Sequence, residues 1–186
     1  MAASLPRYRF TADDYQAMGR AGIIPAETSV ELIDGEVVEM SPIGSRHAYS
    51  VTLLTEHLAS QGGGEALLLV RNPIHLGERD EPQPDLALVR RADYRERLPT
   101  AADLFLVIEV ADTSRDRDRG TKFPRYAEAG IPEAWLVDLV GGLLERQSVP
   151  RDGFYRQIAL ARPGEVLASG VWPSLSIPVN LALGAA

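Results

Sequence analysis

The spacing of apolar residues along the chain alternates between that of helices and that of strands. In residues 46–61, Val51, Leu54 and Leu58 recur at intervals of three or four, which indicates one face of a helix. Short apolar runs bounded by turn residues are typical of strands. They predict strands over residues 66–76, 84–90, 104–110, 134–139, 143–149 and 153–160. A helical pattern returns over residues 120–129, where Gly130 and Pro132 end it.

The first part of the chain and its tail have patterns of their own. Residues 31–40, ELIDGEVVEM, place Asp34-Gly35 between two strand-like runs, which is a strong hairpin signal. A short helix is expected over residues 12–18 with Thr11 as its cap, and the proline-containing tail is expected to be extended edge structure. Helices separated by runs of strands favour an α/β or α+β sheet with helices on its faces, and residues 104–108 are expected in a central strand.

Length and composition narrow the class of protein. The chain has 186 residues, 45% of them hydrophobic and 24% charged, which suits one globular domain covering residues 1–186. It contains no apolar run near about 18 residues and no apolar signal-peptide core, so no membrane partner is expected and the cytoplasm is the expected location. Without cysteine, the fold uses neither a disulfide nor a thiolate metal site.

The charge balance argues against binding of nucleic acid over a broad basic surface. The net charge is −7 and the isoelectric point is about 5.0. A local basic patch is still compatible with the sequence, because two groups of cations occur: Arg90, Arg91, Arg95 and Arg97, and then Arg115, Arg117, Arg119, Lys122 and Arg125. Aspartates between the arginines of the second group equally favour a solvated surface with paired charges.

Two carboxylates stand at the ends of predicted strands. Asp85 opens a strand after Pro84, and Glu109 follows the apolar run 104–108. If these strands pair antiparallel, the start of one lies beside the end of the other, and the two acids become neighbours. Carboxylates 4 Å apart repel by roughly 4 kcal/mol at an effective dielectric of 20, which a raised pKa or a divalent cation such as Mg²⁺ would relieve. The alternative is that each acid is a surface residue at a strand end.

The predicted helix after Glu109 carries a lysine and a tyrosine on one face. Lys122 and Tyr126 are four residues apart, and Pro124 must lie in the first turn, because proline breaks a helix further in. Lys122 therefore lies near the helix start, and a tight loop would turn it toward the end of the preceding strand. A lysine there could meet a phosphate oxygen or an attacking water, and a surface lysine in a polar loop is the alternative.

Taken together, these residues resemble a known family. The chain is similar to the Uma2 (DUF820) family, a restriction-endonuclease-like group of the PD-(D/E)XK nuclease superfamily. The resemblance rests on residues 31–42, His47, 84–89, 107–138 and 175–179, and it covers nearly the whole chain. It implies a restriction endonuclease-like fold, in which helices flank a central mixed β-sheet and an N-terminal β-hairpin precedes it.

The superfamily pattern transfers onto particular residues. Pro84-Asp85 matches its PD, and Glu109 matches the acid of (D/E)XK. The lysine of that motif should be residue 111, where this chain has Ala111. The resemblance implies that the lysine is displaced onto the following helix, where Lys122 takes its role.

Further residues match the family pattern or adjoin it. Glu31 is a candidate ligand of the metal or its water, or else a solvent-facing hairpin residue. His47 is expected to be a packed or hydrogen-bonded histidine at the edge of the cleft. Tyr126 is expected to hold a carboxylate or a phosphate oxygen, with packing on the helix as the alternative. His47, Gln83, Arg115 and Tyr126 are candidate contacts to the substrate, and the arginines of residues 115–119 could supply phosphate contacts beside the site.

The resemblance implies an enzyme, a Mg²⁺-dependent endonuclease that hydrolyses DNA phosphodiester bonds, with Mn²⁺ able to substitute. Asp85, Glu109 and the backbone carbonyl of Val110 would hold the ion, and Lys122 would orient the attacking water or stabilise the developing charge. A homodimer is expected by analogy with nucleases that cut both strands. Two alternatives are a non-catalytic module that binds nucleic acid or protein on the same fold, and a hydrolase of a different phosphate ester.

Overall fold

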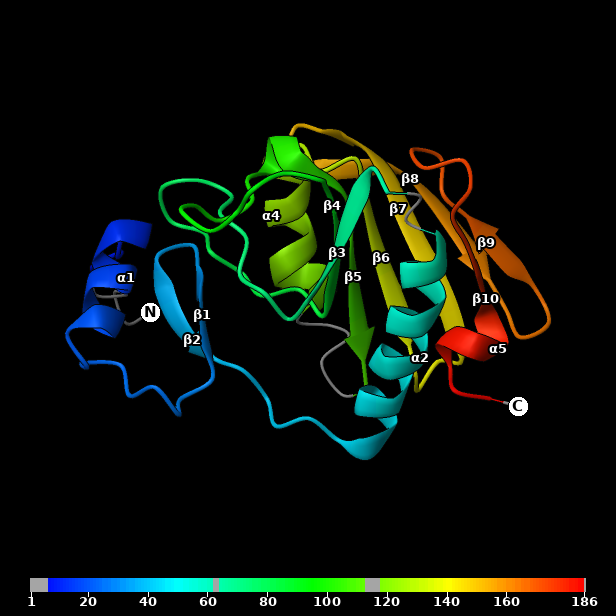
Figure 1. The fold of residues 1–186 in the computed structure, drawn as a ribbon, viewed down its shortest axis with the longest axis horizontal. Coiled ribbons are helices and arrows are strands. Elements are labelled where there is room, and N and C mark those ends of the chain that lie inside the picture. The colour runs from blue at the N-terminus through cyan, green and yellow to red at the C-terminus, as the bar shows by residue number, and fades with distance from the viewer. Residues whose placement is uncertain (1–6, 62–63, 113–117, 186) are drawn as a thin grey trace, which may run out of the picture.

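The apolar runs of the sequence pair into a central sheet of six strands (Figure 1). The computed structural model describes residues 7–61, 64–112 and 118–185. The strands lie in the order β3 (Ala66–Val70), β4 (Leu86–Arg90), β5 (Leu104–Ala111), β6 (Glu133–Asp138), β7 (Leu143–Arg151) and β8 (Phe154–Ala161). Strands β5 and β6 run parallel and the other neighbours in this sheet pair antiparallel, so the sheet is mixed.

Strand β5 is apolar on both faces because each face is covered by a helix. Ile108 lies in the hydrophobic core under helix α2 (Ser45–Gln61). Val107 lies in the second core, under helix α4 (Phe123–Glu128). Successive side chains of a strand point to opposite faces. The alternation therefore turns Glu109 toward α4, although it stands between apolar neighbours.

The connection from β5 to β6 carries the start of helix α4. A π-helical turn, η2 (Asp118–Lys122), leads directly into this helix. Pro124 occupies the first turn of α4, as the sequence predicts. This arrangement places Lys122 at the N-terminal end of α4.

A helix and a hairpin lie together at one end of the molecule (Figure 1). Their bounds are α1 Ala12–Arg20, β1 Val30–Ile33 and β2 Glu36–Glu39. The Thr11 hydroxyl caps α1 by accepting the N–H of Asp14 at 3.1 Å. Asp34 and Gly35 form the hairpin turn with left-handed φ values of 50° and 71°, which glycine adopts at little cost.

The C-terminal part adds a second small pair of strands and a short helix. The elements are β9 (Val166–Ala168), β10 (Ser176–Pro178) and α5 (Val179–Ala182), while a short 3-10 turn, η1 (Ala101–Asp103), lies earlier in the chain, directly before β5. Strands β9 and β10 pair antiparallel outside the six-stranded sheet. Helix α5 contacts α2, where the hydroxyl of Ser50 donates to the carbonyl of Ala182 at 2.6 Å.

The predicted α+β architecture, with a hairpin before a central mixed sheet, is confirmed. The two main helices, the hairpin and the capped helix at Thr11 occur where the sequence predicts them. The strand expected over residues 66–76 ends at Val70, because Arg71 adopts a left-handed φ of 53° and turns the chain. The tail is not wholly extended, since it ends in α5. Within the described residues, no helix is both long and apolar enough to cross a membrane.

The hairpin turn gives a prediction about stability. A Cβ added at Gly35 would lie 2.8 Å from the Cβ of Arg9 and 2.9 Å from the carbonyl oxygen of Phe10. Gly153 follows Asp152 in a turn of the same sequence and similar φ values, but has open space around it. Gly153→Ala should lower the free energy of unfolding by about 1–2 kcal/mol, because of its φ alone. Gly35→Ala should lower it by about 1–3 kcal/mol more, because the added Cβ also meets Arg9 and Phe10.

Urea unfolding of the two glycine variants and the native chain measures this difference. An equal loss of stability in both variants would contradict the packing of the hairpin turn against Arg9 and Phe10, the residues before α1.

Candidate functional site

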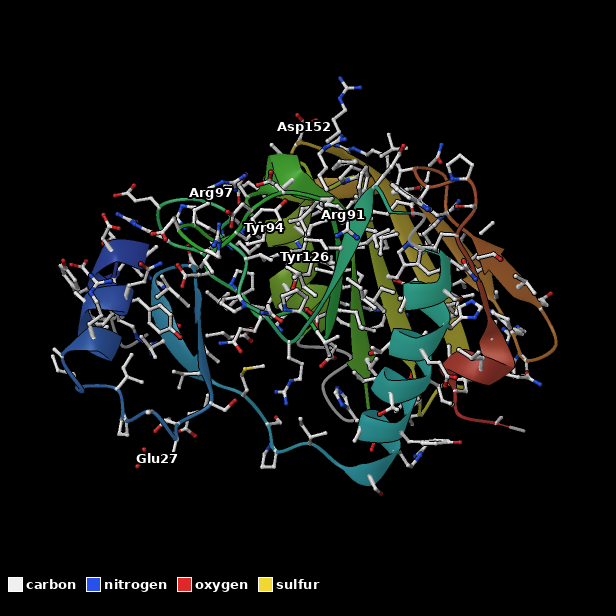
Figure 2. The ribbon with its side chains drawn as sticks, viewed as in Figure 1. Glu27, Arg91, Tyr94, Arg97, Tyr126 and Asp152 are labelled. Carbon is white, nitrogen blue, oxygen red and sulfur yellow. The ribbon has the colours of Figure 1, made fainter. Side chains whose placement is uncertain are left out.

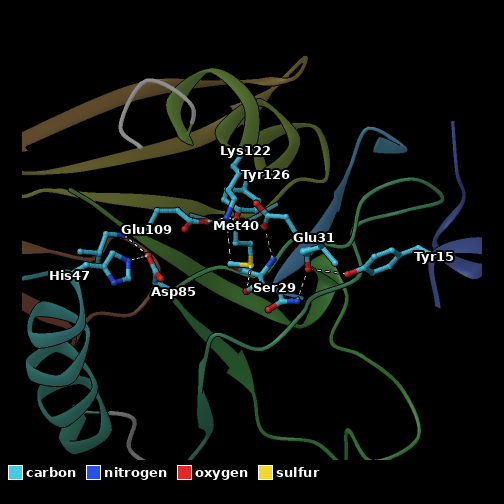
Figure 3. A network of polar contacts seen from close by, with 12 residues as sticks. Tyr15, Ser29, Glu31, Met40, His47, Asp85, Glu109, Lys122 and Tyr126 are labelled. Carbon is cyan, nitrogen blue, oxygen red and sulfur yellow. Dashed lines mark hydrogen bonds and ion pairs between the residues drawn. The ribbon is translucent and has the colours of Figure 1, made fainter. Parts of the chain in front are cut away.

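Antiparallel pairing of β4 and β5 brings the two predicted carboxylates together. Leu86 pairs with Ile108, and one further step of this register sets Asp85 opposite Glu109. Both acids are buried, and both line a pocket of about 230 Å³ at this end of the sheet. Figure 3 shows them together in one network of polar contacts. The alternative of two exposed strand-end residues is wrong.

Glu109 is held by two side chains from the segment that follows it. The hydroxyl of Tyr126 donates to Glu109 Oε1 at 2.5 Å, and Lys122 Nζ lies 3.3 Å from the same oxygen. Tyr126 is fully buried between α4 and the sheet, near the middle of the molecule (Figure 2). A carboxylate inside an apolar strand needs such partners, because burial without them costs several kcal/mol.

Lys122 links the sheet to the hairpin. Its Nζ lies 3.0 Å from Glu31 Oε2 on β1 and donates to the carbonyl of Gln83 at 3.5 Å. Lys122 is the only lysine in the sequence, and its side chain is 5% exposed. The alternative of a surface lysine in a polar loop is therefore wrong.

Glu31 holds the segment before Asp85 as well as the lysine. Its Oε2 accepts the backbone N–H of Gln83 at 3.1 Å, and the amide of Gln83 donates to the carbonyl of Val30 at 3.2 Å. With 1% exposure, Glu31 is not the solvent-facing residue of the alternative reading, and it is not among the residues that line the pocket. Gln83 does line the pocket.

Asp85 is fixed by one backbone and one side-chain contact. Its Oδ2 accepts the N–H of Val110 at 2.8 Å and lies 2.9 Å from Nε2 of His47. His47 is in the first turn of α2, and Figure 3 shows it pointing from this helix toward Asp85. The histidine is thus hydrogen-bonded at the edge of the pocket, as the sequence predicts.

Of the arginines of residues 115–119, which the sequence offers as phosphate contacts, Arg115 and Arg117 lie outside the described residues. Arg119 is described and forms an ion pair with Glu145 of β7, so its charge is already matched within the chain.

Two charged residues that line the pocket, Asp112 and Arg71, were missed as site residues by the sequence analysis. Asp112 Oδ1 lies 3.3 Å from Nη1 of Arg46, a residue of α2. Arg71 follows β3, and its backbone N–H donates to the carbonyl of Asp85 at 3.0 Å. Neither residue belongs to a local pattern, and only the pairing of distant segments brings them here.

The site carries more negative than positive charge. The carboxylates of Glu31, Asp85 and Glu109 carry −3 when ionised, and the cations beside them, Lys122 and Arg71, carry +2, so the set sums to −1. Burial and nearby carboxylates, Glu31 among them, also raise the pKa of Tyr15 beside the hairpin. Such an excess favours a cation. In the described part of the chain, no group of three or more histidine, aspartate and glutamate side chains could hold a metal.

Comparison with known proteins shows where this fold occurs. A crystal structure from Anabaena variabilis ATCC 29413, described as that of "a putative nuclease belonging to DUF820", is similar with a TM-score of 0.69. The similarity covers 94% of this chain and 98% of that chain at 14% sequence identity. At this identity the likeness establishes the fold. No curated protein matches the sequence.

The family follows from the sequence itself. The Uma2 family model, described as "Putative restriction endonuclease", matches residues 12–180, which include every residue of the site. The chain therefore belongs to the Uma2 family.

Proposed function

We propose that this protein is a Mg²⁺-dependent endonuclease that hydrolyses phosphodiester bonds of DNA, with Mn²⁺ able to substitute. The observation that carries the proposal is the meeting of Asp85, Glu109 and Lys122 at one pocket, with Lys122 Nζ 3.3 Å from Glu109 Oε1. Two carboxylates that can bind a metal and a cation beside them suit metal-dependent hydrolysis of a phosphate ester. The family description supports the choice of reaction class.

The donor atoms of the pocket fit magnesium. Asp85, Glu109 and Val110 line it together, so two carboxylates and a backbone carbonyl are available to an ion. Magnesium usually takes one or two carboxylates and keeps several waters, so it does not need a third acidic or histidine ligand. The excess of negative charge at the site supports the same assignment.

The residues around the pocket have distinct tasks in this proposal. When bound, Mg²⁺ would polarise the scissile phosphate and lower the pKa of a bound water. Lys122 would orient the attacking water or stabilise the charge that develops on the phosphate. Tyr126 and His47 act as positioning residues, because they hold the carboxylates of Glu109 and Asp85.

Lys122 replaces the lysine that the superfamily motif places at residue 111. Ala111 is 1% exposed and lies in the core between β5 and α4, so its side chain faces that helix and not the solvent. Lys122 approaches Glu109 from that same side, because it stands at the start of α4. A lysine from the helix can therefore occupy the place of a lysine from the strand.

DNA as substrate and the homodimer are part of the same proposal. A net charge of −7 favours a local contact around the pocket over a broad basic surface. Two copies related by a two-fold axis would present two such pockets to the two strands of a duplex.

The nuclease proposal predicts the effect of removing either carboxylate charge. Asp85→Asn and Glu109→Gln should each lower Mg²⁺-dependent cleavage of supercoiled plasmid DNA by at least ~100-fold, because the ion loses a ligand. Glu56→Gln, on the exposed side of α2, is the matched control and should cleave like the native chain. Native-level cleavage by Glu109→Gln would exclude the assigned site. No cleavage by the native chain would favour the non-catalytic binding module.

Lys122 also gives a prediction about folding. Lys122→Met leaves the buried carboxylates of Glu31 and Glu109 without their cation, so it should lower the free energy of unfolding by about 3–5 kcal/mol. Arg46→Met removes the ion pair to Asp112, in which the arginine is 62% exposed, and one hydrogen bond to the carbonyl of Leu139, and should cost about 1–2 kcal/mol.

Adding Glu31→Gln to Lys122→Met should restore part of the loss, because one unpaired buried charge is then removed. Urea unfolding measures all of these variants. If Lys122→Met lowers the free energy of unfolding no more than Arg46→Met does, the fold does not depend on the buried ammonium of Lys122.

A further inference from the structure

Arg71 has a conformation that is unusual for its residue type. Its φ of 53° lies in the left-handed region, which glycine and asparagine adopt easily and arginine does not. Three other non-glycine residues of the described part of the chain have such φ values, and two of them, Asp34 and Asp152, belong to Asp-Gly turns. Residues held in this region cost about 1–3 kcal/mol and cluster at functional sites.

The backbone of Arg71 is tied to the proposed catalytic acid. Its N–H donates to the carbonyl of Asp85 at 3.0 Å, which extends the pairing of β3 and β4 by one step beyond Val70 and Leu86. The turn at Arg71 therefore has a fixed relation to Asp85, and the arginine lines the same pocket as Asp85 and Glu109.

The guanidinium of Arg71 has no partner among the described residues. It forms no ion pair and donates no side-chain hydrogen bond there, and its Nε is buried without an acceptor. Acidic residues line the same pocket, but they contact other groups: His47 contacts Asp85, Lys122 contacts Glu109 and Arg46 contacts Asp112. A half-buried guanidinium that has no partner in the described part of the chain has capacity for an external anion.

We propose that Arg71 is the phosphate-binding residue of this pocket, and that its guanidinium holds a non-bridging oxygen of the substrate phosphate. The inference rests on the proposed function, because it assumes that the ligand is a phosphate ester. The planar fork of a guanidinium donates two parallel hydrogen bonds to phosphate and stays charged at any working pH. Arg71 would thus hold the phosphate while Lys122, already bound to Glu31 and Glu109, acts at the reacting water or the developing charge.

The direct test uses inorganic phosphate as probe, in metal-free buffer, so that it does not depend on cleavage. Thermal unfolding of the native chain should show a melting temperature that rises with phosphate concentration. In Arg71→Gln the apparent Kd for phosphate should increase about 10-fold or more, the usual loss for one charge-assisted hydrogen bond. Arg20→Gln, an exposed arginine at the end of α1, is the matched control and should respond like the native chain.

Arg71→Gly separates the side chain from the backbone. Glycine accepts the φ of 53°, so this variant should be at least as stable as the native chain and should still lose the phosphate response. Phosphate also stabilises proteins generally, by exclusion from their surfaces. The readout is therefore the difference between each Arg71 variant and Arg20→Gln at equal phosphate.

Cleavage of DNA gives a second readout with a distinct signature. Arg71→Gln should raise KM by about 10–100-fold with a smaller change in kcat, since a contact to the bound phosphate serves substrate and transition state alike. An equal phosphate response in Arg71→Gln and Arg20→Gln overturns the inference about Arg71. A phosphate response that depends on Arg71, in a chain that cleaves no DNA, overturns the nuclease proposal and leaves the phosphate site standing.

Discussion

The ammonium of Lys122, buried between the carboxylates of Glu31 and Glu109, is the interaction on which the site depends. The two distances, 3.0 Å and 3.3 Å, join three segments that are far apart in sequence: the hairpin, the central strand β5 and the start of α4. Each carboxylate would be costly to bury alone, and so would the ammonium. Because the three charges are compensated only together, the hairpin must dock before the pocket has its final form. The sole lysine of the sequence is used at this point.

The same network leaves the pocket acidic, and this connects packing to chemistry. Lys122 matches one of the two carboxylates it touches, so negative charge remains at Asp85 and around Glu109. A divalent ion would complete the balance and, in the proposal, bring the phosphate and the water into one place. Arg71 would then add a contact to the phosphate. Buried partners fix the acids, and the strained turn at Arg71 keeps one guanidinium available.

Much of this arrangement could be predicted from the sequence, because it follows from local sequence patterns and from the pairing of two neighbouring strands, β4 and β5. The Asp-Gly hairpin, the apolar stripe of α2 and the position of Pro124 each indicate their element directly. Antiparallel pairing of two neighbouring strands was enough to place Asp85 beside Glu109. The four-residue spacing of Lys122 and Tyr126 put both on one side of Glu109, even though Ala111 departs from the superfamily motif.

Most of the remaining features depend on contacts between distant segments. Asn72-Pro73 after Arg71 is a turn signal, but it does not indicate a left-handed conformation at Arg71, and the apolar pattern predicted a strand through it. The partners of Glu31 and Arg119 come from other elements. The central claim is that Asp85 and Glu109 bind a divalent ion, and thermal unfolding with Mg²⁺ or Mn²⁺ tests it most directly. At 100 times its Kd the ion should stabilise the native chain by about 2.7 kcal/mol, a rise in Tm of about 5–11 °C. That rise should vanish in Glu109→Gln and persist in Glu56→Gln, whereas no rise in the native chain, or an equal rise in Glu109→Gln, would contradict the claim.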